Sequence, residues 1–218
     1  MNRINIDENV LRTIRALVPQ RRLTYSESLR IAELQANRLL EHFEVADDRV
    51  PSEIVTEFPR VEVRYAHDLP VSGSTHWENG RWIITLNADE PWVRRRFSLM
   101  HEFKHILDHT TKHYLYGSTD HDERSAERAE RAADHFAACL LMPKRRLKGL
   151  WFENGQQLVR VAFKLGVSPR ALSVRLYHLG LAPETPRCAP PTSAYERPAP
   201  SRSRSYLRVS APIMEVAV

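Results

Sequence analysis

The run HEFKH at residues 101–105 constrains the fold of this chain more than any other segment. On an α-helix, residues four apart lie on the same face, roughly 6 Å from one another. The imidazoles of His101 and His105 would then face one metal ion from the same side. The carboxylate of Glu102 would point at a water molecule in the open position of that ion. The segment therefore predicts a helix that carries the core of a metal-dependent hydrolase.

A catalytic zinc site needs a third protein ligand. A second long helix is predicted at about 122–142, with small residues that would let it approach the first helix closely. This stripe consists of Ala126, Ala129, Ala133, Ala137 and Leu140. The same helix offers the carboxylates of Glu127, Glu130 and Asp134. Glu130 and Asp134 form a Glu-x-x-x-Asp pair, so one would bind the metal while the other fixes an imidazole. Spacing alone does not choose between them.

The other histidines fit the site less well. His109 continues the spacing of four, but on a straight helix it lies about 12 Å from His101 and cannot share its metal. His135 is not expected to be a ligand. Asp108 is interpreted either as a residue supporting His105 or as a solvated side chain. A group in the loop after the first helix is interpreted as surface, with an oxyanion-stabilising donor as the alternative; it comprises His113, Tyr114, Tyr116 and His121.

Periodicity predicts an α+β fold with a small antiparallel sheet. Residues 8–45 read as helical, interrupted at Pro19 and restarted at Thr24, where Thr-x-x-Glu resembles a capping box. Residues 61–65 alternate as a strand, and residues 75–86 predict a hairpin with a tight Asn79-Gly80 turn. Further helical stretches are predicted at 156–165 and 168–179.

Composition narrows the class of protein. The 218 residues, 42% of them hydrophobic, suffice for one well-packed domain. No apolar run reaches the ~18 residues of a membrane span, so no membrane partner is expected. Two cysteines without C-x-x-C spacing suggest the reducing cytoplasm. The net charge of +5 permits nucleic-acid contact without requiring it. Residues 183–218, rich in Pro and Arg, predict a disordered tail.

Residues 158–181 have helix-turn-helix spacing around Gly166-Val167-Ser168. Positive charge on this segment makes direct DNA binding one interpretation; it comes from Arg160, Lys164, Arg170 and Arg175. We favour the other interpretation, in which the pair packs against the rest of the protein. The reason is that no set of aromatic, Asn or Gln residues marks a base-reading face.

Two segments together resemble the ImmA/IrrE family of metallo-endopeptidases. They are RFSLMHEFKH at 96–105 and ERAADHFAACLLMP at 130–143. The strand-turn-strand ending at Asn87 and the segment 158–181 also fit that family, so the resemblance covers roughly residues 50–182. It implies a zincin-like metallopeptidase core with two active-site helices and a helix-turn-helix-like pair. The expected domains are therefore 1–50 (N-terminal helical segment), 51–150 (peptidase), 151–182 (helix-turn-helix-like) and 183–218 (tail).

The resemblance also assigns roles. It makes Glu130 the third ligand beside His101 and His105, with Asp134 in a supporting position that is often Asn. The implied cofactor is Zn²⁺, with Mn²⁺ as an alternative, and Glu102 would transfer the proton. The implied substrate is a helix-turn-helix transcriptional repressor, whose cleavage relieves repression. The competing hypothesis is a DNA-binding regulator with a structural or sensory metal.

Two departures from the family pattern are modest. Ser98 stands where Thr is common, and Lys104 stands where a small residue is usual. Lys104 is expected to place a positive charge beside the site and to affect substrate preference.

Overall fold

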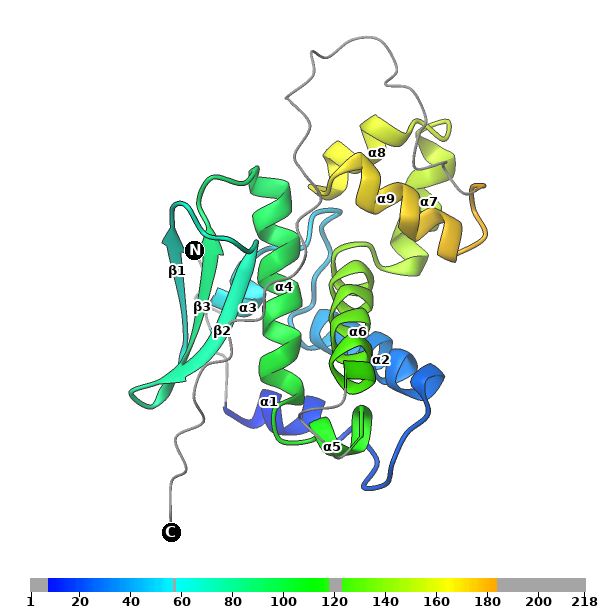
Figure 1. Ribbon diagram of the computed structural model, residues 1–218. Coiled ribbons are helices and arrows are strands. Elements are labelled where there is room, and N and C mark those ends of the chain that lie inside the picture. Colours follow the sequence, from blue (N-terminus) through cyan, green and yellow to red (C-terminus); the bar gives the residue numbers. More distant parts are fainter. Residues whose placement is uncertain (1–7, 57, 118–122, 184–218) are drawn as a thin grey trace. The chain divides into compact units, whose positions relative to one another are not determined.

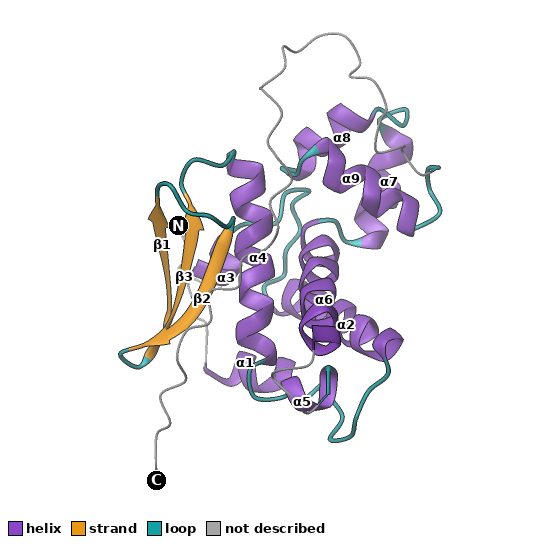
Figure 2. Ribbon diagram, viewed as in Figure 1, coloured by secondary structure: helices purple, strands orange, loops and turns teal. Residues whose placement is uncertain are grey.

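The computed structural model describes residues 8–56, 58–117 and 123–183. These residues combine helices with a small sheet, which confirms the α+β class (Figures 1 and 2). The helices are α1 (Glu8–Arg15), α2 (Tyr25–His42), α3 (Glu53–Thr56), α4 (Trp92–Asp108), α5 (Lys112–Leu115), α6 (Glu123–Leu141), α7 (Lys144–Glu153), α8 (Leu158–Leu165) and α9 (Pro169–His178). The strands are β1 (Val61–Ala66), β2 (Gly73–Glu78) and β3 (Arg81–Asn87).

The described residues all belong to one compact unit. The division at residues 50 and 150 stays a prediction. Apart from Pro183, the predicted tail lies outside the described residues. Within the described ranges, none of the helices has the length and apolar character needed to cross a membrane.

The sheet is mixed rather than antiparallel, with strand order β1-β3-β2. The predicted hairpin is confirmed: β2 and β3 pair antiparallel, and Asn79 and Gly80 have the positive φ angles of 48° and 80° that a tight turn requires. The prediction is wrong for β1, which pairs parallel with β3 from Val61 opposite Trp82 onward. After β1 the chain passes the position of β3 to form β2, and it then turns back as β3 between the two. Strands β1 and β3 are therefore not joined by a hairpin, and they run in the same direction.

Helix α4 lies between the sheet and α6, and α2 packs on α6 (Figure 1). The predicted capping box at the start of α2 is present: the Thr24 side chain accepts from the Glu27 backbone, and the Glu27 carboxylate accepts from the Thr24 backbone. Helix α1 supports the C-terminal end of α4, because Arg15 donates to the carbonyls of Ile106 and Leu107 at 2.8 and 3.1 Å. Carbonyls in the last turn of a helix have no partner within it, so this contact stabilises the end of α4.

Alanines make up much of the buried surface of α6. Ala129, Ala133 and Ala137 are buried as predicted, with Leu140, whereas Ala126 is only partly buried. The described α6 begins at Glu123 and ends at Leu141, close to the expected range. Because alanine side chains are short, the backbones of α6 and its neighbours approach closely, which brings side chains on α6 within reach of α4.

Lys104 is not beside the predicted metal site but fully buried on another face of α4. Its Nζ donates to both carboxylate oxygens of Asp108, one turn further along, and the Tyr116 hydroxyl donates to the same carboxylate. Burial lowers the pKa of Lys104, while the charge of Asp108 opposes that shift. The expectation that Lys104 presents a charge to substrate is therefore wrong. Asp108 is buried and forms an ion pair with Lys104, so it is neither a solvated side chain nor a residue that supports His105.

The substitution Asp108→Ala is expected to lower the free energy of unfolding by about 3–5 kcal/mol, because it leaves the ammonium of Lys104 buried without a counter-charge. Urea denaturation followed by circular dichroism measures the change. The double variant Lys104→Met/Asp108→Ala removes both charges and should recover much of the loss. A single variant as stable as the parent chain would contradict this account of the pair.

Two helices of the structure were not predicted: the single turn of α5, before α6, and α7, directly after it. Helix α7 buries Leu147, Leu150 and Trp151. The predicted turn between α8 and α9 is confirmed: Gly166 ends α8 in the left-handed conformation, and Ser168 caps α9 by accepting from the Ala171 backbone. These helices pack through buried apolar faces.

Candidate metal centre

Three side chains from α4 and α6 meet at one point. His101 and His105 lie one turn apart on α4, and their Nε2 atoms are 3.2 Å apart. Glu130 approaches from α6, with one carboxylate oxygen 3.2 Å from the Nε2 of His101 and the other 3.4 Å from that of His105. Among the described residues, these three form the His/Cys/Asp/Glu cluster whose ligand atoms are close enough to share an ion.

The spacing of these atoms fits a metal ion. A tetrahedral ion with ligand distances of about 2.0–2.1 Å holds its ligand atoms roughly 3.3–3.4 Å from one another. The 3.2 Å between the two Nε2 atoms agrees with that value, and each oxygen of Glu130 lies at a similar distance, 3.2 or 3.4 Å, from a different imidazole. Two imidazole nitrogens and one carboxylate oxygen are a donor set that Zn²⁺ accepts, and the set leaves a fourth position for water.

Asp134 occupies a different place from Glu130. Its carboxylate lies 2.9 Å from the Nδ1 of His101, on the side of the ring that faces away from the Nε2 cluster. A proton held on Nδ1 by this carboxylate leaves Nε2 as the atom with a free lone pair. The geometry thus separates the two carboxylates that spacing alone left open, with Glu130 at the Nε2 atoms and Asp134 behind the ring.

The charges of the cluster follow from its contacts. Burial alone would lower the pKa of His101, but hydrogen bonds with Asp134 and Glu130 outweigh burial and raise it to about 10. Burial and the charge of His101 lower the pKa of His105. Burial opposes ionisation of Glu130, yet its hydrogen bond with His101 and the two nearby imidazoles lower its pKa. Without an ion, a proton on His101 therefore balances the carboxylates.

Metal binding is expected to release about one proton per chain near neutral pH, because His101 must lose its Nε2 proton to bind an ion. Since the pKa of His101 is raised to about 10, its proton competes throughout the neutral range, and the apparent metal affinity should rise with pH. Calorimetric titration with Zn²⁺ in buffers of different ionisation enthalpy measures the proton count. The variant Asp134→Asn lowers that pKa and should release fewer protons. Binding without proton release would contradict the assignment.

Glu102 is held by the edge strand β2. The Thr75 hydroxyl donates to a Glu102 carboxylate oxygen at 2.7 Å. Two residues earlier on the same strand face, Gly73 leaves room for that side chain. A Cβ on Gly73 would lie 3.1 Å from the Glu102 Cγ and 3.2 Å from its Oε1. Strand β2 thus fixes the Glu102 carboxylate on the side of α4 that faces the sheet. In the sequence, Glu102 directly follows His101.

The substitution Gly73→Ala should displace the Glu102 carboxylate by a few tenths of an ångström and lower hydrolysis at the predicted hydrolase site by about 10-fold, because small misplacements of a reacting group are costly. Metal content should stay unchanged, since no ligand moves. Activity and bound metal, measured on the same preparation, separate the two effects. Ser74→Ala is the matched control, since Ser74 is exposed and points to the other face of β2. A loss of metal in Gly73→Ala would contradict this explanation.

The remaining sequence candidates lie elsewhere. Glu127 pairs with Arg131 at 2.7 Å on the exposed side of α6. The ring of His109 packs against Trp82, with 4.8 Å between ring centroids. The Nε2 of His135 lies 3.5 Å from the Sγ of Cys139. His121 falls outside the described residues. Thr75 and Gly73 are the site residues that the sequence alone did not reveal, since no local motif links β2 to a helix far along the chain.

Comparison with known proteins identifies the class of domain. Residues 59–177 match the family model described as the IrrE N-terminal-like domain, a peptidase family. This chain belongs to the ImmA/IrrE family, and the family gives it a metallopeptidase-like character. The match includes β1 to β3, α4, α6 and most of α9.

A solved structure described as a Mycobacterium tuberculosis transcriptional regulator is similar in fold, with a TM-score of 0.56 and 13% sequence identity. The alignment covers 77% of this chain and 51% of that one, so this chain spans about half the length of the regulator. At this identity the similarity shows the fold alone. No curated protein sequence matches this chain.

Proposed function

We propose that this protein is a zinc-dependent endopeptidase, with His101, His105 and Glu130 as the metal ligands and Glu102 as the catalytic base. The observation that carries the proposal is the convergence of the three ligand atoms within 4.8 Å of one another, beside a carboxylate held by β2. Zn²⁺ suits two imidazoles and a carboxylate, and Mn²⁺ is the alternative ion.

A divalent ion at this site supplies a Lewis acid, which acidifies water and polarises the scissile carbonyl. The side chains of this chain do the rest. Glu102 takes a proton from the attacking water and passes it to the leaving amine. Thr75 keeps the Glu102 carboxylate turned toward the site through its 2.7 Å hydrogen bond. Asp134 keeps the His101 ring in the tautomer that directs Nε2 at the cluster.

The sheet edge supports a peptide as substrate. In the described sheet, β2 pairs with β3 on one side and is an edge strand on the other. An extended peptide that adds to this edge would gain main-chain hydrogen bonds and would run past Gly73 and Thr75, next to Glu102. This placement brings a backbone amide, rather than a small molecule, to the site.

The substrate we propose is a helix-turn-helix transcriptional repressor, whose cleavage relieves repression. Family membership supports this choice, and the similar solved structure is named as a transcriptional regulator. The test incubates the metal-loaded protein with repressors encoded near its gene, and the products are resolved by mass spectrometry. One defined cut that Glu102→Gln abolishes is expected. Intact repressors throughout would refute this substrate without touching the metal site.

A DNA-binding regulator with a structural or sensory metal is the second candidate. The observation in its favour is exposed positive charge on α8 and α9, from Arg160, Lys164 and Arg170. Arg175 does not contribute, because it is buried and donates to the carbonyl of Met142. Exposed apolar side chains also interrupt this surface, Val159 and Phe163 at 69% and 74% exposure. Tight, salt-dependent duplex binding without cleavage of any repressor would favour this candidate.

A further inference from the structure

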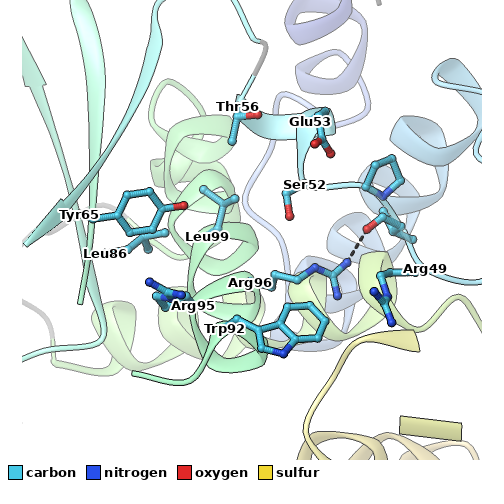
Figure 3. Close-up of a pocket in the computed structure, with 12 residues that line it drawn as sticks. Arg49, Ser52, Glu53, Thr56, Tyr65, Leu86, Trp92, Arg95, Arg96 and Leu99 are labelled. Carbon is cyan, nitrogen blue, oxygen red and sulfur yellow. Dashed lines mark hydrogen bonds between the residues drawn. The ribbon is translucent and has the colours of Figure 1, made fainter. Parts of the chain in front are cut away.

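A cavity of about 470 Å³ opens on the face of α4 away from the histidines. The first two turns of α4, the segment before and within α3, and the strands β1 and β3 line it (Figure 3). Leu99 in its wall and His101 in the metal site are two residues apart, so their side chains point roughly 200° apart around the helix. The cavity is therefore distinct from the metal site, although both are built on α4.

Three guanidinium groups make the cavity positive. Arg49, Arg95 and Arg96 line it, and Glu53 is the one acidic residue among the lining side chains. Arg96 is buried and donates to the carbonyls of Leu165 and Val50. Burial, with a contribution from the charge of Arg49, lowers the pKa of Arg96 to about 10. An anion in the cavity would relieve this crowding of like charges.

Aromatic rings hold two of these groups in place. The Arg95 guanidinium lies 5.5 Å from the centre of the Tyr65 ring, and that of Arg49 lies 5.2 Å from the centre of the Trp92 ring. Within the described residues, no carboxylate forms an ion pair with Arg95. Stacking fixes the plane of a guanidinium but leaves its N–H groups available, which prepares it for a planar or tetrahedral anion.

We propose that this cavity binds a phosphorylated small molecule of mononucleotide size. Arg95 would bind the phosphate, and Arg49 and Arg96 would add positive potential. Leu86 and Leu99 give the cavity an apolar wall for a ring, as Figure 3 shows beside Tyr65. The Glu53 carboxylate is suited to accept hydrogen bonds from sugar hydroxyls.

Two of these arginines hold the α8–α9 pair, Arg96 from α4 and Arg49 from the segment before α3. Arg49 donates to the carbonyl of Phe163 at 3.1 Å, and Arg96 donates to those of Leu165 and Gly166. Gly166 has a φ of 65°, and a Cβ there would lie within 3 Å of Arg96, Trp92 and Arg49. A ligand on these arginines would therefore reinforce the attachment of the helical pair. This inference rests on the cavity alone and does not depend on peptidase activity.

The test is calorimetric titration of the full-length chain with AMP, ribose 5-phosphate, adenosine and inorganic phosphate. AMP or ribose 5-phosphate should bind with a dissociation constant below ~1 mM. Adenosine and inorganic phosphate should each bind at least ~10-fold more weakly than the better of the two, because each lacks one of the recognised parts. Preference between AMP and ribose 5-phosphate tells whether a base or only a sugar is bound. The phosphate ligand should also raise the melting temperature.

Variants locate the site. Arg95→Ala should weaken binding at least ~10-fold, because it removes a charged hydrogen-bond donor. Arg94→Ala is the matched control. Arg94 is next to Arg95 in the sequence but contacts Glu90 and Ser72 outside the cavity, so this variant should bind the ligand as the parent chain does. No binding, equal binding by Arg95→Ala, or equal binding of adenosine or inorganic phosphate would overturn the proposal. Loss of binding in His105→Ala would instead place the ligand at the metal and would overturn it too.

Discussion

Replacing Glu102 by Gln is expected to reduce the rate of peptide cleavage by ~10²–10⁴-fold, the usual contribution of a general acid–base residue. Gln keeps the size of the side chain and can still bond to Thr75, but its amide cannot take a proton from water. Metal content should stay at one ion per chain, because Glu102 is not among the three clustered ligands. Cleavage kinetics and elemental analysis of the same preparation test both halves of this expectation.

The control for Glu102→Gln is Glu127→Gln, which makes the same chemical change on the exposed side of α6. Glu127 pairs with Arg131 and does not reach the cluster, so its replacement should leave cleavage unchanged. Full activity in Glu102→Gln would remove the proposed mechanism. Loss of metal in that variant would show instead that the carboxylate belongs to the ligand set.

Replacing His105 by Ala is expected to lower metal affinity by more than ~100-fold and to abolish cleavage. Loss of a residue that only orients a ligand already lowers metal affinity by about 10–100-fold, so loss of a ligand itself should lower it further. Asp134→Ala tests that lower range, because Asp134 contacts His101 from behind rather than facing the ion. Competition titration with a chromophoric chelator measures all three affinities. The expected order is parent chain, then Asp134→Ala, then His105→Ala.

The chain offers its own control for this series. His109 lies four residues after His105, with the same spacing as His105 from His101, but its ring packs on Trp82. His109→Ala should therefore keep metal affinity while removing the same number of atoms. An equal loss in His109→Ala and His105→Ala would mean that the metal binds at the end of α4 instead of between α4 and α6.

Local spacing was enough to predict the imidazole pair. His101, Glu102 and His105 share one helix, so the helix period alone determines how they face. The capping box at Thr24 and the Asn79-Gly80 turn are local in the same sense, and both are confirmed. The relative positions of residues within about four positions of one another can therefore be predicted from local sequence alone.

Contacts between distant segments were harder to predict. The helix period on α6 left Glu130 and Asp134 as equal candidates, because their difference depends on how α6 lies against α4. Thr75 is 27 residues from Glu102, and only the packing of β2 on α4 brings them together. The burial of Lys104 also depends on tertiary structure, since a lysine beside two histidines resembles a surface residue until its neighbours are placed.

The alanines of α6 have a consequence for ion selectivity. Ala133 and Ala137 lie on the same side of α6 as Glu130, by helix spacing, and are buried. Small side chains at a helix contact let the two backbones approach, and the distance between α4 and α6 would limit the radius of an ion that His101, His105 and Glu130 could all reach. A single added methyl group there would widen the coordination sphere and shift preference toward larger ions. At the proposed metal site, the choice between ions would thus depend in part on side chains that are not ligands.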